Sequence, residues 1–358
     1  MSGPEPAADV LVARAGRAGR ITLNRPAALN ALTLGMVRAI DDALAAWAGD
    51  PSVDLVLLDG AGERGFCAGG DIRALRASAL AGDDAAAAFW REEYVLNGQI
   101  ARYPKPVVAI MDGIVMGGGI GLAGHASHRV ATERLRAAMP EVGIGFFPDV
   151  GGTWLLARAP GQLGTHLALT GDAVGTADAL ACGLADVHVP VADVPALVAA
   201  LTRDGAEAIH VDATVDAFAR PPAEPPALAA ARPWIDAAYA GATVPAILRA
   251  LDDGGPEARA AAALIRTRSP TSVAVTLRAL RDAAALALDD VLERELHVAC
   301  AFLDAPDFVE GIRAAVVDKD RDPRWSPAGH DAVTPALVDR FFAQELTPRA
   351  AADPGPGA

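Results

Sequence analysis

The sequence predicts an α/β core followed by a mostly helical C-terminal region. Two continuous apolar runs, at 53–59 and 106–111, are typical of strands that are buried on both faces. Helical patterns lie between and after these runs, and strands that alternate with helices predict crossover connections around a sheet. After about residue 205 the composition changes, and most of the patterns that follow are helical.

The core begins with an expected strand pair at 9–14 and 20–24. A helix is expected over 33–48, because Thr33 can cap its first turn and apolar residues recur behind it at helical spacing. Further helices are expected over 84–102, 118–125, 151–158, 161–169, 176–182 and 192–203.

A proline-rich stretch at 220–226 is too stiff for the interior of a helix and predicts a linker or loop. We therefore expect a core over 1–205, a helical C-terminal region over 206–350 and a disordered tail over 351–358. The helices expected in the C-terminal region lie over 227–240, 244–253, 257–267, 270–287, 289–303 and 334–344.

The composition excludes several classes of partner. The chain has 358 residues, of which 52% are hydrophobic, so it can bury a large core. Its formal net charge of -14 disfavours binding to nucleic acids or to anionic membranes. No apolar stretch has the length of about 18–20 residues that an uninterrupted membrane span needs. An anionic ligand would need local arginines and helix N-termini around its phosphates.

The cysteines and the N-terminus suggest a compartment. Cys67, Cys182 and Cys300 are widely spaced, which predicts neither a disulfide framework nor a zinc site. The N-terminus has no basic region followed by an apolar run, so we expect no secretory signal. A reducing cytoplasm is the location that these features favour. No metal site is expected.

Two glycine-rich turns follow the two apolar runs, at 65–72 and 112–121. Glycine lets a backbone approach a ligand closely, so two such turns can aim two peptide N–H groups at one oxygen. This geometry makes an oxyanion hole, which stabilises negative charge as it develops on a carbonyl oxygen. A nearby carboxylic acid, Glu141, would complete a site for acyl or enolate chemistry.

At these positions the chain resembles the crotonase (enoyl-CoA hydratase/isomerase) superfamily and, within it, the 3-hydroxyisobutyryl-CoA hydrolases. The resemblance implies the crotonase (ClpP/crotonase-like) fold of repeated ββα units and an acyl-CoA substrate, with no cofactor beyond the coenzyme A of that substrate. It extends from about residue 10 to about residue 327, and its specificity comes from the order of the motifs. The matching stretches are 24–26, 29–33, 66–72, 91–94, 116–122, 139–141, 147–152, 269–272, 307–313 and 318–320.

The resemblance assigns catalytic roles to particular residues. Gly70 and Gly118 match the oxyanion donors, although glycines can also serve only to permit tight turns. Glu141 matches the principal catalytic carboxylate. It could attack the thioester to form an anhydride or deprotonate a water, and the sequence does not choose between these routes.

The resemblance also implies a set of substrate-binding residues. Asp149 would bind the 3-hydroxyl of the substrate and orient the acyl group, and it could also cap the helix expected near Gly151. Glu93 would contact the substrate, whereas Glu92 is a solvated neighbour. The substrate-binding residues are Glu93, Gly118, Glu141 and Asp149.

Coenzyme A would lie along the first glycine turn. Arg25, Arg73 and Lys319 are candidate partners for its phosphates. The positions that match the adenine and pantetheine path are Arg25, Ala28, Ala68, Asp71 and Ile72.

Gly121 separates the possible reactions. In hydratases the position two after the triple glycine carries a second catalytic glutamate, and hydration needs two carboxylates. Gly121 has no side chain, which favours the hydrolase over a hydratase and leaves room for water or the hydroxyl group. The resemblance then implies hydrolysis of 3-hydroxyisobutyryl-CoA in valine degradation. The alternatives are an enoyl-CoA hydratase or isomerase, or a catalytically silent acyl-CoA-binding protein. A homo-oligomer is compatible with the resemblance.

Overall fold

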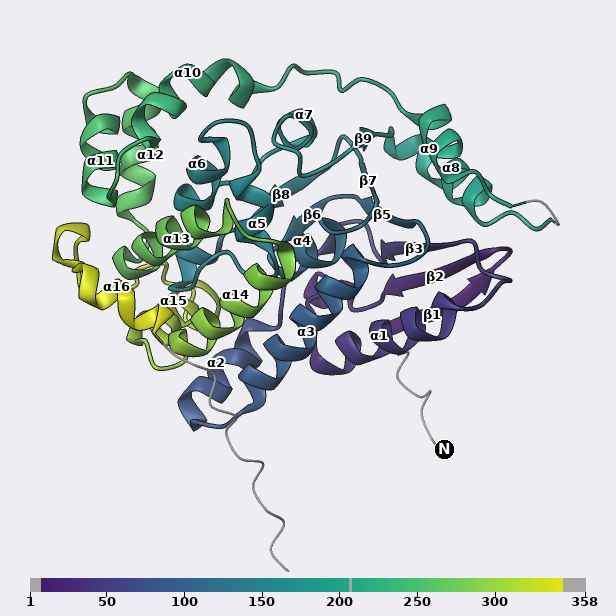
Figure 1. Cartoon of the computed structure of the whole chain (residues 1–358), viewed down its shortest axis with the longest axis horizontal. Coiled ribbons are helices and arrows are strands. Elements are labelled where there is room, and N and C mark those ends of the chain that lie inside the picture. Colours follow the sequence, from purple (N-terminus) through teal and green to yellow (C-terminus); the bar gives the residue numbers. More distant parts are fainter. Residues whose placement is uncertain (1–7, 206–207, 344–358) are drawn as a thin grey trace, which may run out of the picture.

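The strands form two sheets in the computed structural model, which describes residues 8–205 and 208–343 (Figure 1). Within the large sheet only the β1–β2 pair is antiparallel, and the small sheet is entirely parallel. The large sheet has the order β1 (Val10–Ala15), β2 (Ala18–Leu23), β3 (Leu55–Gly60), β5 (Val107–Met111), β7 (His128–Ala131) and β9 (Val187–His188). The small sheet has the order β4 (Gly65–Cys67), β6 (Ile114–Met116) and β8 (Arg136–Ala138).

The two sheets are built from a repeated unit. A strand of the large sheet is followed by a short strand of the small sheet and then by a helix, as in β3–β4–α2 and β5–β6–α4. The third unit, β7–β8, ends in a single 3₁₀ turn, η2 (Glu141–Ile144). Gly113 has a φ of +64° in the turn between β5 and β6, where a Cβ would lie 2.6 Å from a backbone oxygen. This arrangement matches the repeated ββα units that the resemblance implies.

Helices cover the sheets. Thr33 caps α1, because its Oγ1 accepts a hydrogen bond from the N–H of Met36 at 3.3 Å. In the core α3 packs on α1 and on α4. The helices of the core are α1 (Leu34–Ala48), α2 (Ile72–Ala81), α3 (Ala85–Ala101), α4 (Gly118–Ala123), α5 (Gly152–Ala157), α6 (Leu163–Thr170), α7 (Thr176–Ala181) and α8 (Val194–Leu201).

The C-terminal helices lie mainly on the side of α5 and α6, away from β1 (Figure 1). α13 packs on α5 and α6, and α14 packs on α3. These helices are α9 (Val211–Phe218), α10 (Ala227–Tyr239), α11 (Val244–Asp252), α12 (Pro256–Arg266), α13 (Pro270–Ala283), α14 (Leu288–Phe302), α15 (Pro306–Ile312) and α16 (Pro335–Phe342). None of the helices described by the structure is both long and apolar enough to cross a bilayer.

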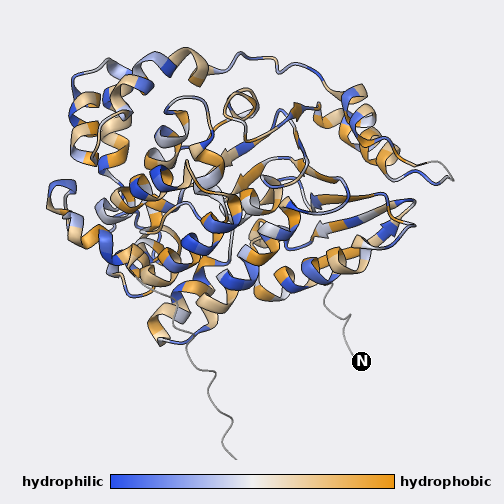
Figure 2. Cartoon of the chain, viewed as in Figure 1, coloured by the Kyte–Doolittle hydropathy of each residue, from blue (hydrophilic) through white to orange (hydrophobic). Residues whose placement is uncertain are grey.

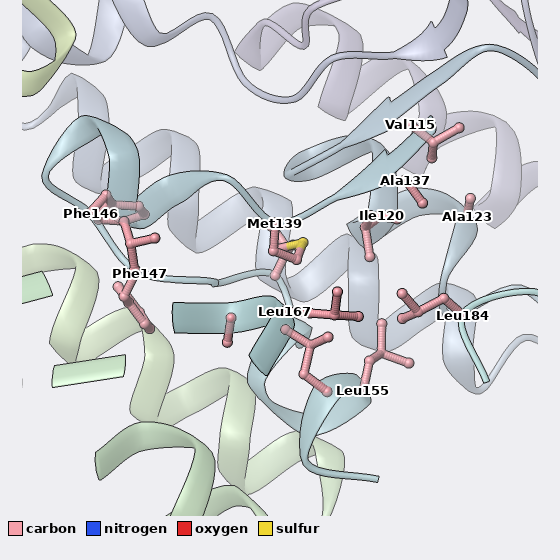
Figure 3. Close-up of a cluster of buried hydrophobic side chains, with 14 of the residues drawn as sticks. Val115, Ile120, Ala123, Ala137, Met139, Phe146, Phe147, Leu155, Leu167 and Leu184 are labelled. Carbon is pink, nitrogen blue, oxygen red and sulfur yellow. The ribbon is translucent and has the colours of Figure 1, made fainter. Parts of the chain in front are cut away.

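One large hydrophobic core joins the sheets to the C-terminal helices. Figure 2 shows β3 and β5 as mostly hydrophobic, in agreement with their burial. Figure 3 shows side chains from α4, β8 and the segment that follows β8 gathered in one cluster. Phe302 of α14 extends this core, because its ring stacks on Phe147 at 5.6 Å and contacts Phe341 at 4.5 Å.

The structure confirms the helices expected from the sequence and adds elements that the sequence did not predict. The stretch 220–226 contains no helix or strand, as expected. The additional strands and α-helices are β4, β6, β7, β8, β9, α2, α9 and α15. These strands have at most four residues, which is too short for a periodic pattern. The division near residue 205 stays a prediction, and the expected tail at 351–358 lies outside the described residues.

Replacing Phe302 with alanine should destabilise the whole protein, because the residue is fully buried among aromatic rings. We expect the free energy of unfolding in urea to fall by about 3–5 kcal/mol. Leu80→Ala is the control, because Leu80 is 60% exposed on α2 and its loss should change this free energy by less than about 0.5 kcal/mol. Equal effects of the two variants would contradict the shared core.

Candidate active site

Three sequence-predicted residues meet where the strands of the small sheet end. Gly70 lies just after β4, Gly118 begins α4 just after β6, and Glu141 begins η2 just after β8. Because these strands are parallel neighbours, their carboxyl ends lie side by side. A Cβ on Gly118 would lie 3.4 Å from the peptide nitrogen of Gly70, and one on Gly117 would lie 2.8 Å from Oε1 of Glu141.

The backbone hydrogen bonds of the two glycine turns leave out the candidate oxyanion donors. The first turn is held by hydrogen bonds from the N–H of Ala68 to Leu29 and from that of Asp71 to Leu32. The bonds that hold the second turn run from Gly117 to Ala138 and from Gly121 to Gly117. Among the described residues, none of these bonds uses the N–H of Gly70 or Gly118. An oxyanion hole would require both groups to be free to donate, and these bonds leave them so.

Carboxyl groups surround these donors. Glu93 on α3 is 2% exposed, and Glu141 and Asp149 are each 6% exposed. Asp149 Oδ2 accepts a hydrogen bond from the hydroxyl of Tyr94 at 2.6 Å. No described residue donates a hydrogen bond to Glu93 Oε1 or to Glu141 Oε2. Buried oxygens are nearly always hydrogen-bonded, so these two unpaired oxygens are exceptions. A hydrogen-bond donor on a ligand could pair with them.

Burial shifts the protonation of this cluster. Burial raises the pKa of Glu93 and that of Glu141 well above their usual value, and the charge of Asp149 adds to both increases. Burial also raises the pKa of Asp149 to about 7, although the hydrogen bond from Tyr94 opposes the increase. In the described part of the chain, no basic side chain is close enough to offset the cost of charging these groups. The cluster therefore holds protons at neutral pH.

A residue from the C-terminal region holds the turn that follows Asp149. Glu295 on α14 accepts hydrogen bonds from the N–H of Gly151 at 2.6 Å and from that of Thr153 at 3.1 Å. Val150 in this turn has a φ of +55°, which a β-branched residue rarely adopts. The expectation that Asp149 caps the helix is wrong, because its carboxyl binds Tyr94 and Glu295 occupies the capping position.

The space beside Gly121 is filled. A Cβ on Gly121 would lie 2.7 Å from Cβ of Val150 and 3.0 Å from Nδ2 of Asn97. The expectation of room for water at this position is therefore wrong. Asn97 is fully buried on α3, and neither its Oδ1 nor its Nδ2 has a hydrogen-bond partner among the described residues. Sequence reasoning missed Asn97, although it lies one helical turn after Glu93 and on the same face.

The expected coenzyme A residues lie in two adjacent segments, 25–32 and 68–72, which hydrogen bonds join. Ala28 is exposed, and Ala68, Asp71 and Ile72 are half-buried. The guanidinium of Arg25 lies 3.4 Å from Asp71 and 3.7 Å from Asp9. Arg25 is therefore already paired with carboxylates, which weakens its candidacy as a phosphate partner.

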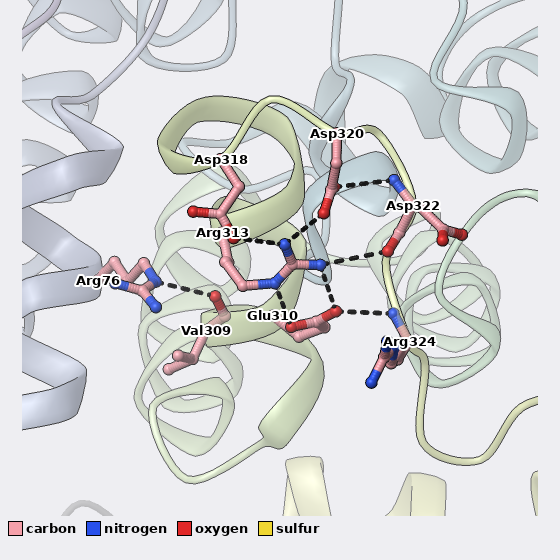
Figure 4. Close-up of polar contacts among 8 residues, drawn as sticks. All are labelled: Arg76, Val309, Glu310, Arg313, Asp318, Asp320, Asp322 and Arg324. Carbon is pink, nitrogen blue, oxygen red and sulfur yellow. Dashed lines mark hydrogen bonds and ion pairs between the residues drawn. The ribbon is translucent and has the colours of Figure 1, made fainter.

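The other two candidate phosphate partners, Arg73 and Lys319, come from segments far apart in the sequence. Arg73 on α2 donates a hydrogen bond to the carbonyl of Val316 at 2.6 Å. Lys319 follows Val316 in the sequence and is exposed. Figure 4 shows how Arg313 holds this loop, because its guanidinium binds the carboxylates of Glu310, Asp318 and Asp320. These hydrogen bonds raise the pKa of Arg313.

A family model described as enoyl-CoA hydratase/isomerase matches residues 18–342. Relatives named mitochondrial 3-hydroxyisobutyryl-CoA hydrolase include that of Xenopus tropicalis, which is 41% identical over 93% of this chain and 88% of its own. The human relative of the same name is 39% identical over 94% and 89% of the two chains.

Two solved structures confirm the predicted fold class. One is described as a carnitinyl-CoA dehydratase from Mycobacterium thermoresistibile, with 51% identity, a TM-score of 0.90, and 95% and 97% of the two chains covered. The other is described as an enoyl-CoA hydratase from Rhodobacter sphaeroides, with 45% identity, a TM-score of 0.86, and 94% and 97% covered.

The comparisons contradict the cytoplasmic location expected from the sequence, because the curated relatives are named as mitochondrial proteins. The cysteines misled this prediction for a physical reason. Widely spaced thiols suit any reducing compartment, so they do not distinguish the cytoplasm from others.

In the described ranges, no group of three or more histidine, cysteine, aspartate or glutamate residues could hold a metal ion.

The buried carboxyls should make stability depend on pH. The pKa is about 7 for Asp149 and about 8 for Glu295, whereas unfolded carboxyls titrate near ~4. Between these values the folded state binds more protons, so the free energy of unfolding should fall as pH rises from about 5 to 8. Urea titrations across this range measure the slope.

Glu93→Gln should flatten this slope, because it removes one buried carboxyl whose pKa is raised. Glu92→Gln is the matched control, because Glu92 pairs with Arg38 at the surface and the pKa of its carboxyl is lowered. A slope that is unchanged in Glu93→Gln would show that Glu93 is ionised in the folded protein.

Proposed function

The chain belongs to the enoyl-CoA hydratase/isomerase family, and we propose that it hydrolyses 3-hydroxyisobutyryl-CoA to 3-hydroxyisobutyrate and coenzyme A. Curated relatives of that name, near 40% identity over almost the whole chain, support thioester hydrolysis. The observation that carries the proposal is that Gly70, Gly118 and Glu141 follow neighbouring strands of the small sheet, with Oε1 of Glu141 2.8 Å from the Cβ position of Gly117. The reaction would serve valine degradation and would need no metal or redox cofactor.

Gly70 and Gly118 would receive the thioester oxygen. Their N–H groups donate to that oxygen as it gains negative charge, and each such donor is worth about 3–4 kcal/mol of barrier. The carbonyl carbon would then face Glu141. Asp149, oriented by the hydroxyl of Tyr94, would bind the 3-hydroxyl of the acyl group. Arg73 and Lys319 would approach the phosphates of coenzyme A.

Glu141 would act by one of two routes. As a nucleophile, its oxygen bonds to the thioester carbon, the C–S bond breaks, and coenzyme A leaves as a thiolate. Water then cleaves the resulting anhydride and restores the carboxylate. As a general base, Glu141 takes a proton from a water whose oxygen attacks the same carbon, the C–S bond breaks, and the proton passes to the departing thiolate. Both routes require the ionised carboxylate, and its raised pKa means that the rate would increase with pH.

A dehydratase or hydratase is the second candidate, because two solved relatives carry these descriptions. Glu93 offers a second buried carboxyl, with its Oε1 2.5 Å from the Cβ position of Gly118. Against this candidate, Val150 and Asn97 fill the space beside Gly121, where a hydratase of this family places its second glutamate.

Glu141→Gln should abolish thiol release from 3-hydroxyisobutyryl-CoA, because the amide is a poor nucleophile and base. We expect a fall of about 10²–10⁴-fold in kcat, followed with a chromogenic thiol reagent. Glu92→Gln is the control, because Glu92 is only half-buried and its carboxylate pairs with Arg38. Wild type that releases no thiol but consumes the enone absorbance of crotonyl-CoA would overturn the proposal in favour of a hydratase.

Turnover in water labelled with ¹⁸O can identify the nucleophilic route. If Glu141 is the nucleophile, water that attacks the Glu141 carbon of the anhydride leaves ¹⁸O in this side chain. Mass spectrometry of the peptide that contains Glu141 measures the label after many turnovers. An unlabelled peptide with labelled product would exclude water attack at the Glu141 carbon, and it is the outcome expected of the general-base route and of attack at the acyl carbon of the anhydride. Enzyme incubated without substrate is the control.

A further inference from the structure

Glu295 is a buried carboxyl to which the proposed reaction gives no role. It lies on α14, is 2% exposed, and accepts hydrogen bonds from a single turn. Its Oε2 accepts from the N–H of Gly151 at 2.6 Å, and its Oε1 accepts from the N–H and from the hydroxyl of Thr153. Burying a carboxyl is costly unless hydrogen bonds compensate for the lost water, and here the turn supplies these bonds. The side chain is therefore placed to hold the turn.

The backbone of this turn is in a conformation that needs support. Val150 has a φ of +55°, which a β-branched residue rarely adopts, and Gly151 follows with a φ of +77°. On the other side of the turn, Nε2 of His125 lies 2.8 Å from the carbonyl oxygen of Val150. Unfavourable backbone conformations persist only where the surrounding structure holds them. Glu295 and His125 provide this support from different elements.

Asp149 is held from two sides by helices that pack on each other. Its carbonyl oxygen accepts a hydrogen bond from the N–H of Gly152 at 2.6 Å, so Asp149 belongs to the turn that Glu295 binds. Its carboxyl accepts a hydrogen bond from the hydroxyl of Tyr94 on α3, and α14 packs on α3. Burial raises the pKa of Glu295, and the charge of Asp149 adds to this increase, which indicates that the two carboxyls are near each other. The helix pair thus fixes both the backbone and the carboxyl of Asp149.

We propose that Glu295 is a positioning residue, which fixes Asp149 where its carboxyl can bind the 3-hydroxyl of the acyl group. Through Asp149 it would set the preference for hydroxyacyl over unsubstituted acyl thioesters. This inference rests on the proposed hydrolase function, which it deepens, and it requires no contact between Glu295 and the substrate. A site built to hydrogen-bond a hydroxyl strongly rejects a substrate that lacks it. Such discrimination depends on position, because a displacement of about 1 Å can cost about 100-fold in rate.

The test compares kcat/KM for 3-hydroxyisobutyryl-CoA and isobutyryl-CoA, which differ only in the hydroxyl. Glu295→Gln keeps the volume but turns an amide NH₂ toward an N–H donor of the turn, which displaces Asp149. We expect kcat/KM for the hydroxyacyl substrate to fall by about 10–100-fold, and that for isobutyryl-CoA to change by less than about threefold. Glu293→Gln is the matched control, because Glu293 is exposed on the same helix, and its ratio should remain that of wild type.

A double variant separates positioning from packing. If Glu295 acts through Asp149, adding Glu295→Gln to Asp149→Ala should not lower the ratio of the two kcat/KM values any further. A further fall of this ratio in the double variant would overturn the proposal. Thr153→Val removes only the hydroxyl donor to Glu295, and its ratio should fall in the same direction by a smaller factor. It also serves as the second variant if Glu295→Gln does not fold.

Two other outcomes would overturn the proposal. An equal loss of activity on both substrates in Glu295→Gln would mean that the turn supports the site in general and not the recognition of the hydroxyl. An unchanged ratio with a lower Tm would mean that Glu295 contributes only to stability.

Failure of the proposed function would be visible separately. Wild type that releases thiol from neither substrate would refute the hydrolase. Calorimetry with the intact thioesters would then compare their affinities, and it replaces kcat/KM for any thioester that wild type binds without hydrolysing it. Weaker binding of 3-hydroxyisobutyryl-CoA alone in Glu295→Gln would still support the role of Glu295. Equal affinities of wild type for both thioesters would overturn it.

Discussion

The candidate site depends on the convergence of β4, β6 and β8. Each strand is only three residues long, yet parallel pairing fixes where each one ends relative to its neighbour. Gly70, Gly118 and Glu141 are therefore neighbours although long stretches of chain separate them. The large sheet supports this arrangement, because each short strand follows one of its strands through a tight turn. Rigid elements thus hold the groups that the chemistry needs.

The burial of several carboxyl groups together makes it costly to ionise them at this site. Glu93, Glu141 and Asp149 are buried together, and the phenol of Tyr94 is the hydrogen-bond donor that the structure gives to Asp149. Such groups retain protons unless a ligand or a conformational change stabilises their charge. A substrate that donates a hydrogen bond to one carboxylate would lower its pKa and thereby change the protonation of its neighbours. The state of the cluster therefore depends on what is bound to it.

Sequence patterns could predict the helices and the main catalytic candidates for different physical reasons. The apolar runs of β3 and β5 and the capped start of α1 follow local rules. Gly70, Gly118 and Glu141 could be identified because their motifs occur in a fixed order. The short strands that join these motifs were missed, since three residues show no periodicity. The catalytic roles of Gly70, Gly118 and Glu141 remain predictions that the geometry supports.

Other residues of the site could not be predicted from local sequence. Asn97 and Glu295 occur within helices, where most polar side chains face solvent, and only the folded structure shows which residues surround them. Val150 adopts a left-handed conformation that its β-branched side chain disfavours. This conformation is stable because Glu295 and His125 bind the same turn from different elements.

The bond from Glu295 to the turn at Gly151 has a consequence for how the enzyme matures during synthesis. The ribosome makes all of β1–β8 well before it makes α14. Until α14 emerges and docks, the N–H groups of Gly151 and Thr153 lack their carboxylate partner, and the strained turn beside Asp149 lacks its support. A nascent chain that already contains Gly70, Gly118 and Glu141 is therefore still incomplete as a catalyst. Activity should appear only as the last helices are added.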